Sequence, residues 1–177
     1  MKLKGSEIMS SILLIGMPMC GKSTNGSLLS KSLNLEYMDT DEEIERIEGT
    51  NIPSIFALKG KNYFRNLESS ILDDVKLKHR FVISTGGGTP MFFNNMEKLK
   101  KIGTTIFLNT PLNILEERLK SSHNRPLLIK AGKNALSKLY NERLKVYRNA
   151  DFTIDCEDKI PEQICKLIEA YILLINN

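Results

Sequence analysis

Near the start of the chain, two glycines, a lysine and two hydroxyl side chains stand close together. Residues 13–24 read LLIGMPMCGKST, in which Gly16 and Gly21 enclose four residues and Lys22 and Ser23 follow directly. This G-x-x-x-x-G-K-[ST] spacing is typical of a loop whose backbone N–H groups surround a polyphosphate, while the lysine reaches the terminal phosphates and the first hydroxyl binds Mg²⁺. A strand-like run precedes the loop and a helical pattern follows it. We therefore expect a phosphate site here rather than a strand–turn–helix with accidental glycines.

Two later turns carry residue types that suit a small hydroxylated ligand. Asp39 and Asp41, in the sequence DTD, supply two carboxylates that could hold Mg²⁺ through water and accept hydrogen bonds from a substrate hydroxyl. The alternative for this turn is a helix cap with surface acids. Three consecutive glycines at 86–88 would allow the backbone to approach a ligand closely, or they form a loose turn.

Several arginines could bind anions. Arg65 and Glu68 stand three positions apart in YFRNLESS, so Glu68 can orient Arg65 towards a planar carboxylate, although a solvated ion pair is the alternative. Arg125 lies in SSHNRPLLIKAG, a basic segment that could close as a lid over the transferring phosphoryl group. Arg143 and Tyr147 fall one turn apart on a predicted helix.

Alternating strands and helices would position these residues. We expect strands at 11–15, 35–38, 81–84, 104–109 and 152–155. We expect helices at 23–33, from 40 or 41 onwards, and at 53–58, 62–78, 91–101, 111–120, 134–149 and 161–175, with a loop at 121–133. Such alternation predicts a parallel sheet covered on both faces, with ligands at the carboxyl ends of its strands. The glycine loop, the DTD turn and the TGGG turn should therefore converge on one crevice.

Composition indicates one globular domain without an obvious macromolecular partner. The 177 residues are 41% hydrophobic and 26% charged, and the formal net charge of +4 is too mild to argue for nucleic acid. The segment 118–148 is rich in Lys and Arg, as a solvated face or as the cationic side of an anion site. No apolar stretch reaches the length of a membrane span. The start, MKLKGSEIMSSILLIG, is not expected to be a signal peptide, because Glu7 interrupts it and its apolar run leads into the glycine loop; Met9 could be the natural start. Cys20, Cys156 and Cys165 show no metal spacing and favour a reducing cytoplasm.

The ordered set of motifs resembles the shikimate kinases. The resemblance runs from about Ser11 to Asp155 and includes GMPMCGKST, DTD, the F-R-x-x-E of 64–68, STGGGTP, the RPLL of 125–128 and the R-x-x-x-Y of 143–147. It implies an α/β P-loop kinase fold of the nucleoside monophosphate kinase type, with a five-stranded parallel sheet flanked by helices on both faces. The chain 1–177 would form a single domain with a substrate-binding segment at about 40–68 and a small lid at about 121–133.

The resemblance also implies a reaction and a role for each matching position. In this family the γ-phosphate of ATP passes to the 3-hydroxyl of shikimate with Mg²⁺, giving shikimate 3-phosphate and ADP on the way to aromatic amino acids. Lys22 would act on the β- and γ-phosphates, Asp41 would bind hydroxyls and help to take the proton, and Arg125 would be the lid residue on the transferring phosphate. The remaining implied contacts are Arg65 and Arg143 on the shikimate carboxylate beside Gly86, Gly87 and Gly88; Ser23 and, through water, Asp39 on Mg²⁺; and Gly16, Met17, Pro18, Met19, Cys20, Gly21, Lys22, Ser23, Thr24, Arg118 (stacked on adenine) and Arg125 on ATP.

One residue departs from the family pattern, and two other functions compete with the implied one. Met19 stands where the family commonly has glycine, and a left-handed backbone is costly for methionine. The first rival is another small-molecule kinase of the same fold, such as a gluconate or nucleoside monophosphate kinase, which would need different acceptor contacts. The second is a nucleotide switch without catalysis, although a guanine-specific N-K-x-D signature is absent from the sequence. We expect a cytoplasmic monomer that binds shikimate and ATP, with no nucleic acid or membrane partner.

Overall fold

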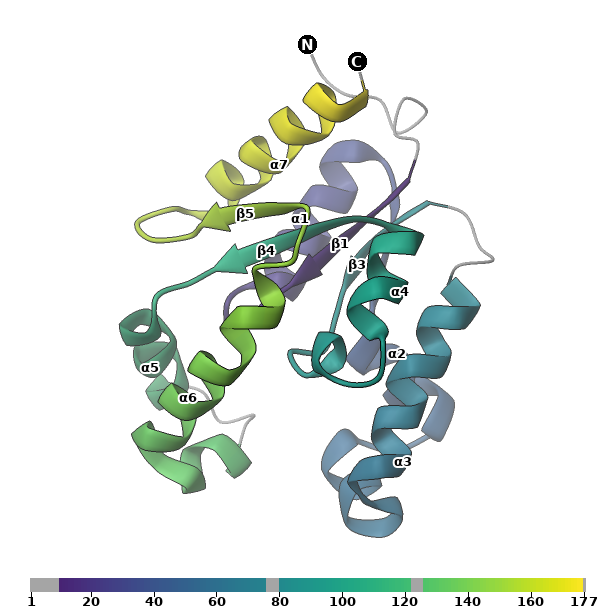
Figure 1. The fold of residues 1–177 in the computed structure, drawn as a ribbon, viewed down its shortest axis with the longest axis vertical. Helices are drawn as coiled ribbons and strands as arrows, with labels where there is room; N and C mark the ends of the chain where they lie inside the picture. The colour runs from purple at the N-terminus through teal and green to yellow at the C-terminus, as the bar shows by residue number, and fades with distance from the viewer. Residues whose placement is uncertain (1–9, 76–79, 122–125, 177) are drawn as a thin grey trace.

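A five-stranded parallel sheet organises the molecule. The computed structural model describes residues 10–75, 80–121 and 126–176, and within 126–134 it describes the backbone alone (Figure 1). The strands are β1 (Ser11–Ile15), β2 (Glu36–Asp39), β3 (Phe81–Ser84), β4 (Gly103–Asn109) and β5 (Phe152–Asp155). They pair in the order β2-β3-β1-β4-β5, with every neighbouring pair parallel. The expected strands and the expected sheet type are confirmed.

Helices cover both faces of this sheet. They are α1 (Lys22–Leu33), α2 (Thr40–Glu48), α3 (Ile52–Val75), α4 (Asn95–Ile102), α5 (Leu112–Ser121), α6 (Pro126–Tyr147) and α7 (Pro161–Asn176), with a short 3₁₀ helix at Thr89–Met91. Figure 1 shows α4 in front of the sheet and α1 behind it, and α1 packs against α7. At the lower end of the view, α5 and α6 lie on one side of the sheet and α2 and α3 on the other.

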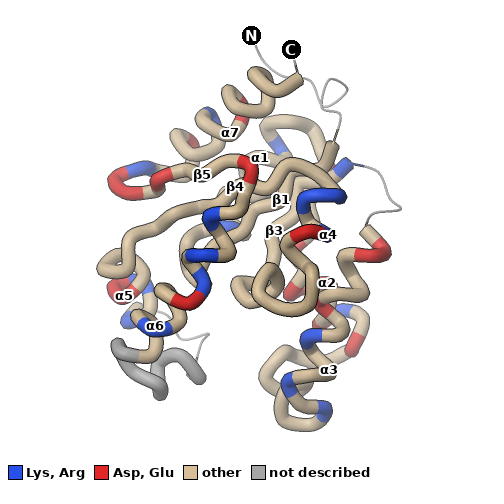
Figure 2. Tube along the Cα trace, in the orientation of Figure 1, with Lys and Arg blue, Asp and Glu red and all other residues tan. Residues whose placement is uncertain are grey.

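The sheet forms the centre of the core because its middle strands are buried on both faces. Residues 12–15 of β1 are fully buried, and each is a leucine or isoleucine. Such unbroken apolar runs are typical of parallel strands, which need β-branched and aliphatic side chains on either face. Among the helices in the described ranges, none is long and apolar enough to cross a membrane. Figure 2 shows Lys and Arg along α4 and α6 and acidic residues in the turn after β5.

The helix pattern differs from expectation in the middle of the chain. The helices expected at 53–58 and 62–78 form the two parts of α3, interrupted at Gly60 with φ 81° and ψ 171°, a conformation that favours glycine. The helix expected from 91 begins only at Asn95, because Phe92 is extended and Phe93 has a left-handed φ of 51°. Residues 76–79 lie outside the described part.

The loop expected at 121–133 is wrong for its second half. The backbone is helical from Pro126 onwards, as the first turn of α6. Proline is well suited to the first helical position, where its missing N–H is not needed, and the following LLIKA contains good helix formers. The prediction gave too much weight to proline as a helix breaker. Residues 122–125, which include Arg125, lie outside the described residues, so the lid stays a prediction.

Candidate active site

The glycine loop joins β1 to α1 and has an unusual backbone. Gly16 and Gly21 have φ values of 146° and 95°, and a Cβ on Gly16 would meet the Cys20 sulfur at 2.8 Å and the Leu108 carbonyl oxygen at 2.9 Å. Met19 has φ 65°, so methionine adopts here the left-handed conformation that favours glycine, at a cost of about 1–2 kcal/mol. The loop keeps its tight shape with methionine at this position.

Lys22 begins α1 directly after the loop. Its side chain is 8% exposed, and Nζ donates hydrogen bonds to the carbonyls of Gly16 at 3.0 Å and Met17 at 2.9 Å. The helix N-terminus has Gly21 as its cap, and no side chain there accepts its N–H groups. Free N–H groups and the helix dipole favour an anion at this point. The ammonium and the helix end therefore provide positive charge at the same loop.

Asp39 connects the phosphate loop to the next helix. Its Oδ2 accepts hydrogen bonds from the Ser23 hydroxyl at 2.7 Å and the Tyr37 hydroxyl at 3.3 Å, and its Oδ1 accepts from the Asp41 N–H at 3.0 Å. Burial, together with the charge of Asp39, raises the pKa of Tyr37 to about 12, so the phenol remains a neutral donor. Asp39 thus caps α2, as the alternative for the DTD turn expected, and it also holds the Ser23 hydroxyl; its part in Mg²⁺ binding stays a prediction. The Ser23 and Asp39 oxygens fit Mg²⁺, which prefers oxygen ligands and keeps several waters.

The three glycines at 86–88 lie against three of the predicted ligand-binding side chains. A Cβ on Gly86 would be 2.5 Å from Asp41 Oδ1, one on Gly87 would be 3.1 Å from Arg143 Nη1, and one on Gly88 would be 2.7 Å from Arg65 Nη1. Real Cβ atoms essentially never approach other atoms within 3.0 Å, so a side chain at Gly86 or Gly88 would displace a charged group, and one at Gly87 would meet Pro18 Cδ at 2.9 Å and crowd Arg143. The glycines are required here for close approach, and the interpretation as a loose turn is wrong.

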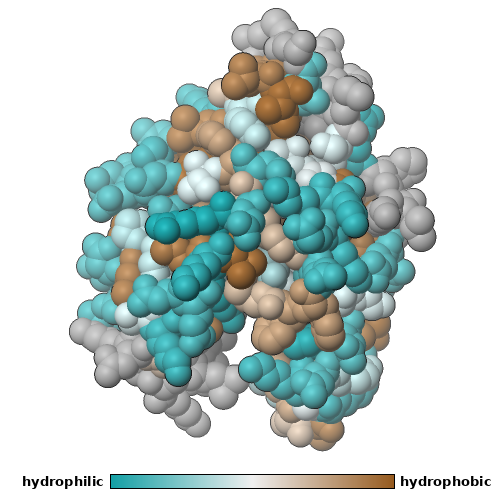
Figure 3. Space-filling view, viewed as in Figure 1, coloured by the Kyte–Doolittle hydropathy of each residue, from teal (hydrophilic) through white to brown (hydrophobic). Residues whose placement is uncertain are grey.

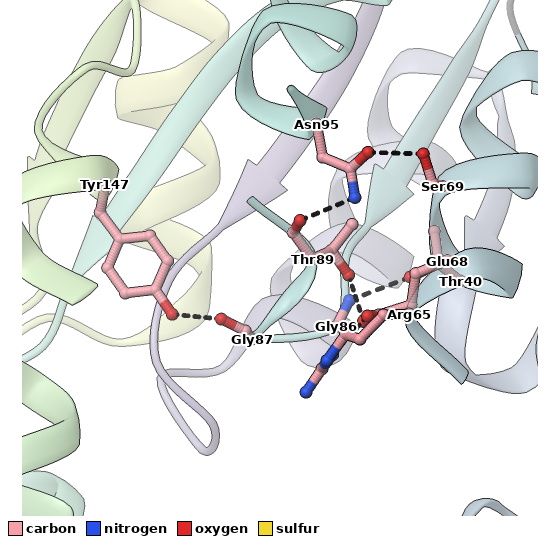
Figure 4. A network of polar contacts seen from close by, with 9 residues as sticks. All are labelled: Thr40, Arg65, Glu68, Ser69, Gly86, Gly87, Thr89, Asn95 and Tyr147. Carbon is pink, nitrogen blue, oxygen red and sulfur yellow. Dashed lines mark hydrogen bonds and ion pairs between the residues drawn. The ribbon is translucent and has the colours of Figure 1, made fainter. Parts of the chain in front are cut away.

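Arg65 is held by buried partners. Its Nη1 pairs with Glu68, and the two side chains are 12% and 1% exposed. Glu68 also accepts a hydrogen bond from the Thr89 hydroxyl at 2.7 Å, as Figure 4 shows. The guanidinium carbon lies 4.3 Å from the centroid of the Phe92 ring. The interpretation of Arg65 and Glu68 as a solvated surface pair is therefore wrong, and Glu68 orients Arg65.

Side-chain hydroxyls on either side of the glycine turn form hydrogen bonds with its backbone. The Gly86 N–H donates to the Thr40 hydroxyl at 2.9 Å, and the Tyr147 hydroxyl donates to the Gly87 carbonyl at 2.5 Å (Figure 4). Tyr147 is fully buried and stacks on Phe107 with 5.1 Å between ring centroids. Burial raises the pKa of Tyr147 far above its ordinary value, against an opposing effect of Arg143, so the phenol stays protonated as a donor. The sequence paired Arg143 with Tyr147 by spacing but did not show that the tyrosine anchors the glycine turn.

One cavity joins the phosphate loop to the DTD turn. It has a volume of about 600 Å³. Its lining includes the predicted Met19, Cys20, Gly21, Lys22, Ser23, Thr24, Asp39, Asp41, Gly87 and Arg118. Arg118 donates to the Met19 carbonyl at 2.9 Å and so lies at the edge of the loop. Figure 3 shows a notch in the surface at the lower end of the view, beside the lobe formed by α2 and α3.

Some lining residues were missed by sequence reasoning. Cys156, Lys159, Pro161 and Ile164 form the wall of this cavity that follows β5. The available signal was their position after the carboxyl end of the fifth strand, at the same sheet edge as the three recognised turns. Burial raises the pKa of Cys156 to about 12, so this wall presents a neutral thiol. A second depression, of about 690 Å³, lies over the turn after β5 and shares Lys159 with the first.

The structure brings most of the predicted residues to one edge of the sheet. Asp41 and Gly87 line the cavity, and the glycine turn 86–88 lies against Asp41, Arg65 and Arg143 on one side and against Pro18 of the phosphate loop on the other. The arrangement combines cationic groups for a polyphosphate, carboxylates for hydroxyls, and arginines for a second anion. Arg125 lies outside the described residues.

Known proteins resemble this chain over most of its length. A sequence model of the shikimate kinase family matches residues 18–172. The shikimate kinase of Aquifex aeolicus is 45% identical over 157 residues, which cover 89% of this chain and 92% of that protein. The structure of shikimate kinase from Acinetobacter baumannii in complex with shikimate has a TM-score of 0.87 and 32% identity, covering 96% of each chain.

A more distant likeness concerns the fold alone. The gluconokinase of Sinorhizobium meliloti has a TM-score of 0.66 at 15% identity, covering 96% of this chain and 94% of its own. The expected P-loop kinase fold is confirmed by the sheet and by the shikimate kinase structures. The chain belongs to the shikimate kinase family, whose members are kinases that transfer phosphate to shikimate.

Proposed function

We propose that this chain transfers the γ-phosphate of ATP to the 3-hydroxyl of shikimate, giving shikimate 3-phosphate and ADP for aromatic amino acid biosynthesis. One observation carries the proposal. Gly87 lines the same cavity as Lys22 and also lies against Arg143. The cationic phosphate loop and the glycine turn with its neighbouring arginine therefore adjoin one another. A triphosphate and a small carboxylic acid can therefore meet there.

The phosphate side of the site is formed by residues 16–24. Their N–H groups and the Lys22 ammonium would hold the β- and γ-phosphates, and Arg118 would contact the nucleotide from the edge of the loop. Arg125 would close over the transferring phosphoryl group as part of a lid at about 121–133. Phosphoryl transfer depends mainly on positioning and charge stabilisation, which is what fixed N–H groups and cations supply.

Ser23 and Asp39 are the proposed Mg²⁺ holders, Asp39 through water. The 2.7 Å contact between their oxygens supports this assignment. When bound, the ion would offset the negative charge of the β- and γ-phosphates. The role of Ser23 itself is to present its hydroxyl oxygen at the first turn of α1, where Asp39 orients it.

The acceptor side is formed by the segment at about 40–68 together with the glycine turn. Arg65 and Arg143 would bind the carboxylate, and the backbone of Gly86–Gly88 would lie against the ring. Asp41 would accept the proton of the 3-hydroxyl while the oxygen of that hydroxyl bonds to the γ-phosphorus. The bond between the γ-phosphorus and the β–γ bridging oxygen would break in the same step. The support for Asp41 is its place in the same cavity as Lys22 and against Gly86. We further propose that the chain works as a single-domain monomer in the cytoplasm with these two small molecules as its partners.

The test uses three acceptors in parallel. The protein is mixed with ATP and Mg²⁺ and with shikimate, gluconate or AMP, and ADP release is followed. Of the three acceptors, we expect only shikimate to cause ADP release, and the product should be phosphorylated at the 3-hydroxyl. Release with gluconate or AMP instead would replace the proposed function with that of another kinase of the same fold.

A further inference from the structure

The Arg65 guanidinium lies over an aromatic ring from another part of the chain. The guanidinium carbon lies 4.3 Å from the centroid of the Phe92 ring and 5.2 Å from that of Phe64. Glu68 occupies Nη1, and the backbone of Gly88 lies directly against the terminal nitrogens. Arg65 is therefore paired with Glu68 through Nη1, has Gly88 beside its terminal nitrogens, and lies over the face of the Phe92 ring.

A guanidinium held over an aromatic ring keeps for a ligand those N–H groups that no protein partner occupies. A guanidinium binds a carboxylate with its N–H groups in its own plane, whereas a ring stacks above that plane. The ring also attracts the cation through its quadrupole, which an aliphatic side chain of similar size would not do. The Arg65 Nε is buried and has no hydrogen-bond partner among the described residues. The Nε N–H can therefore donate a hydrogen bond to a ligand.

Phe92 is itself held firmly in place. The Met91 N–H donates to the Gly88 carbonyl at 3.0 Å, and the Asn95 N–H donates to the Phe92 carbonyl at 3.2 Å. The Asn95 side chain is fully buried, donating to the Thr89 carbonyl at 3.0 Å and accepting from the Ser69 hydroxyl at 2.9 Å (Figure 4). These bonds attach the segment after the glycine turn to α3, the helix that carries Arg65.

The next residue has a strained backbone. Phe93 has φ 51°, a left-handed conformation that is rare for a bulky residue, and its side chain is 63% exposed. Strain of this kind persists where the surrounding structure imposes it, and it gathers at functional sites. With this left-handed backbone the side chain of Phe93 is exposed to solvent, whereas Phe92 lies beside Arg65.

We propose that Phe92 is a positioning residue that fixes the plane in which Arg65 meets the carboxylate of the acceptor. This inference rests on the proposed function, because it assumes that Arg65 binds that carboxylate. Phe92 touches Arg65 and acts through it. Its loss should therefore weaken the acceptor and not the nucleotide.

The test compares Phe92→Leu, which keeps an apolar side chain of similar volume, with Phe92→Tyr, which keeps the ring. Calorimetric titration should show the dissociation constant for shikimate raised about 3- to 30-fold in Phe92→Leu and within about twofold of wild type in Phe92→Tyr. The constant for ATP should stay within about twofold in both. Phe93→Ala is the matched control, since it alters the neighbouring exposed ring and should leave both constants unchanged.

A double-mutant cycle separates positioning from general support of the fold. In an Arg65→Met background, Phe92→Leu should add no further loss of shikimate affinity, because the group it positions is gone. The uncharged methyl ester of shikimate should likewise bind Phe92→Leu and wild type equally. If Phe92→Leu does not fold, the affinities of Phe92→Tyr and the wild type for shikimate and for its methyl ester are compared instead. A loss of affinity in Phe92→Tyr that is equal for the acid and the ester would count against the proposal.

Two failures can be told apart. A wild-type protein that does not phosphorylate shikimate contradicts the proposed function. A wild-type protein that does so, while Phe92→Leu binds shikimate normally or loses ATP equally, overturns the role of Phe92 alone. A Phe92→Leu loss that persists in the Arg65→Met background overturns it too.

Discussion

Glu68 shows how strongly single residues of this site depend on buried partners. Its carboxylate is 1% exposed, and it is satisfied by Arg65 and the Thr89 hydroxyl. A buried charge without such partners is very costly, so the three side chains act as a unit. The position of the arginine on α3 and the position of the glycine turn are therefore coupled through one carboxylate.

Lys22→Ala should abolish phosphoryl transfer and leave the fold intact. Within the described residues, the hydrogen bonds of the ammonium go to loop groups, the Gly16 and Met17 carbonyls and the Cys20 sulfur, so its removal should lower the free energy of unfolding by no more than about 2 kcal/mol. The loss of its charge near the transferring phosphate should lower kcat by at least about 100-fold. Coupled measurement of ADP release tests this, with Lys31→Ala, in the last turn of the same helix, as control. Turnover that survives in Lys22→Ala would contradict the role.

Arg65→Ala should weaken shikimate binding about 10- to 100-fold, because a charge-assisted bidentate contact contributes about 1.5–3 kcal/mol. ATP binding should change by less than about twofold. Alanine also leaves Glu68 buried without its cation, so Arg65→Lys should be measured beside it to keep the charge and remove only the fork. Arg46→Ala is the control, since Arg46 forms the same i,i+3 pair with Glu43 but is 70% exposed. Equal losses for shikimate and ATP in Arg65→Lys would refute the assignment.

At the scale of elements, the turns at strand ends carry the chemistry, while contacts between strands carry part of the stability. Asp151, just before β5, accepts hydrogen bonds from the Thr105 N–H at 2.9 Å and hydroxyl at 2.7 Å and lies 3.3 Å from Lys100 Nζ. Burial acts to raise the pKa of Asp151, but the Thr105 hydrogen bonds and the Lys100 charge outweigh it and lower the pKa below the ordinary 3.8. The ionised carboxylate therefore joins β5 to β4.

Asp151→Asn should lower the free energy of unfolding by about 1 kcal/mol at neutral pH, through weaker hydrogen bonds to Thr105. A lowered folded-state pKa means that the wild-type contribution is complete above the ordinary value and is lost as pH falls through the folded-state pKa. Urea unfolding at neutral and acid pH should show the gap between wild type and variant closing in acid. Asp74→Asn, on the exposed side of α3, serves as control. A gap that stays constant with pH would argue against the carboxylate as its source.

Gly60 shows an element boundary that the sequence already indicated. A helical pattern on each side of it predicted two helices, and the structure interrupts α3 there with a positive φ. The start of α4 could not be predicted in the same way. Its first residue, Asn95, is held by a side-chain bond to the nearby Thr89 and by another to Ser69, which lies on α3 in a distant part of the chain. Local backbone sterics leave a signal in the sequence, whereas a tertiary hydrogen bond does not.

At the scale of the whole molecule, ligands that bind the folded protein should stabilise it, and the more so the further their concentration exceeds the dissociation constant. Shikimate at about 100 times its dissociation constant should add about 2.7 kcal/mol to the free energy of unfolding, and so raise Tm by about 5–10 °C. Gluconate at equal concentration should produce no shift, since it lacks the rigid ring that the glycine turn would accept. Thermal unfolding with each compound, with and without ADP and Mg²⁺, measures this. An equal shift with gluconate would remove the claimed selectivity.

The sequence by itself determined the parts of this protein that depend on local pattern: the phosphate loop, the alternation of strands and helices, and the turns at the strand ends. It raised but could not settle whether Met19 adopts a left-handed backbone, and it could not show the hydrogen bond from Tyr147 to the glycine turn or the cavity wall formed by Cys156 and Pro161. Only the tertiary structure decided these. The sheet order β2-β3-β1-β4-β5 brings the carboxyl ends of separate strands together, and buried polar groups then pair with whichever partners that order places beside them.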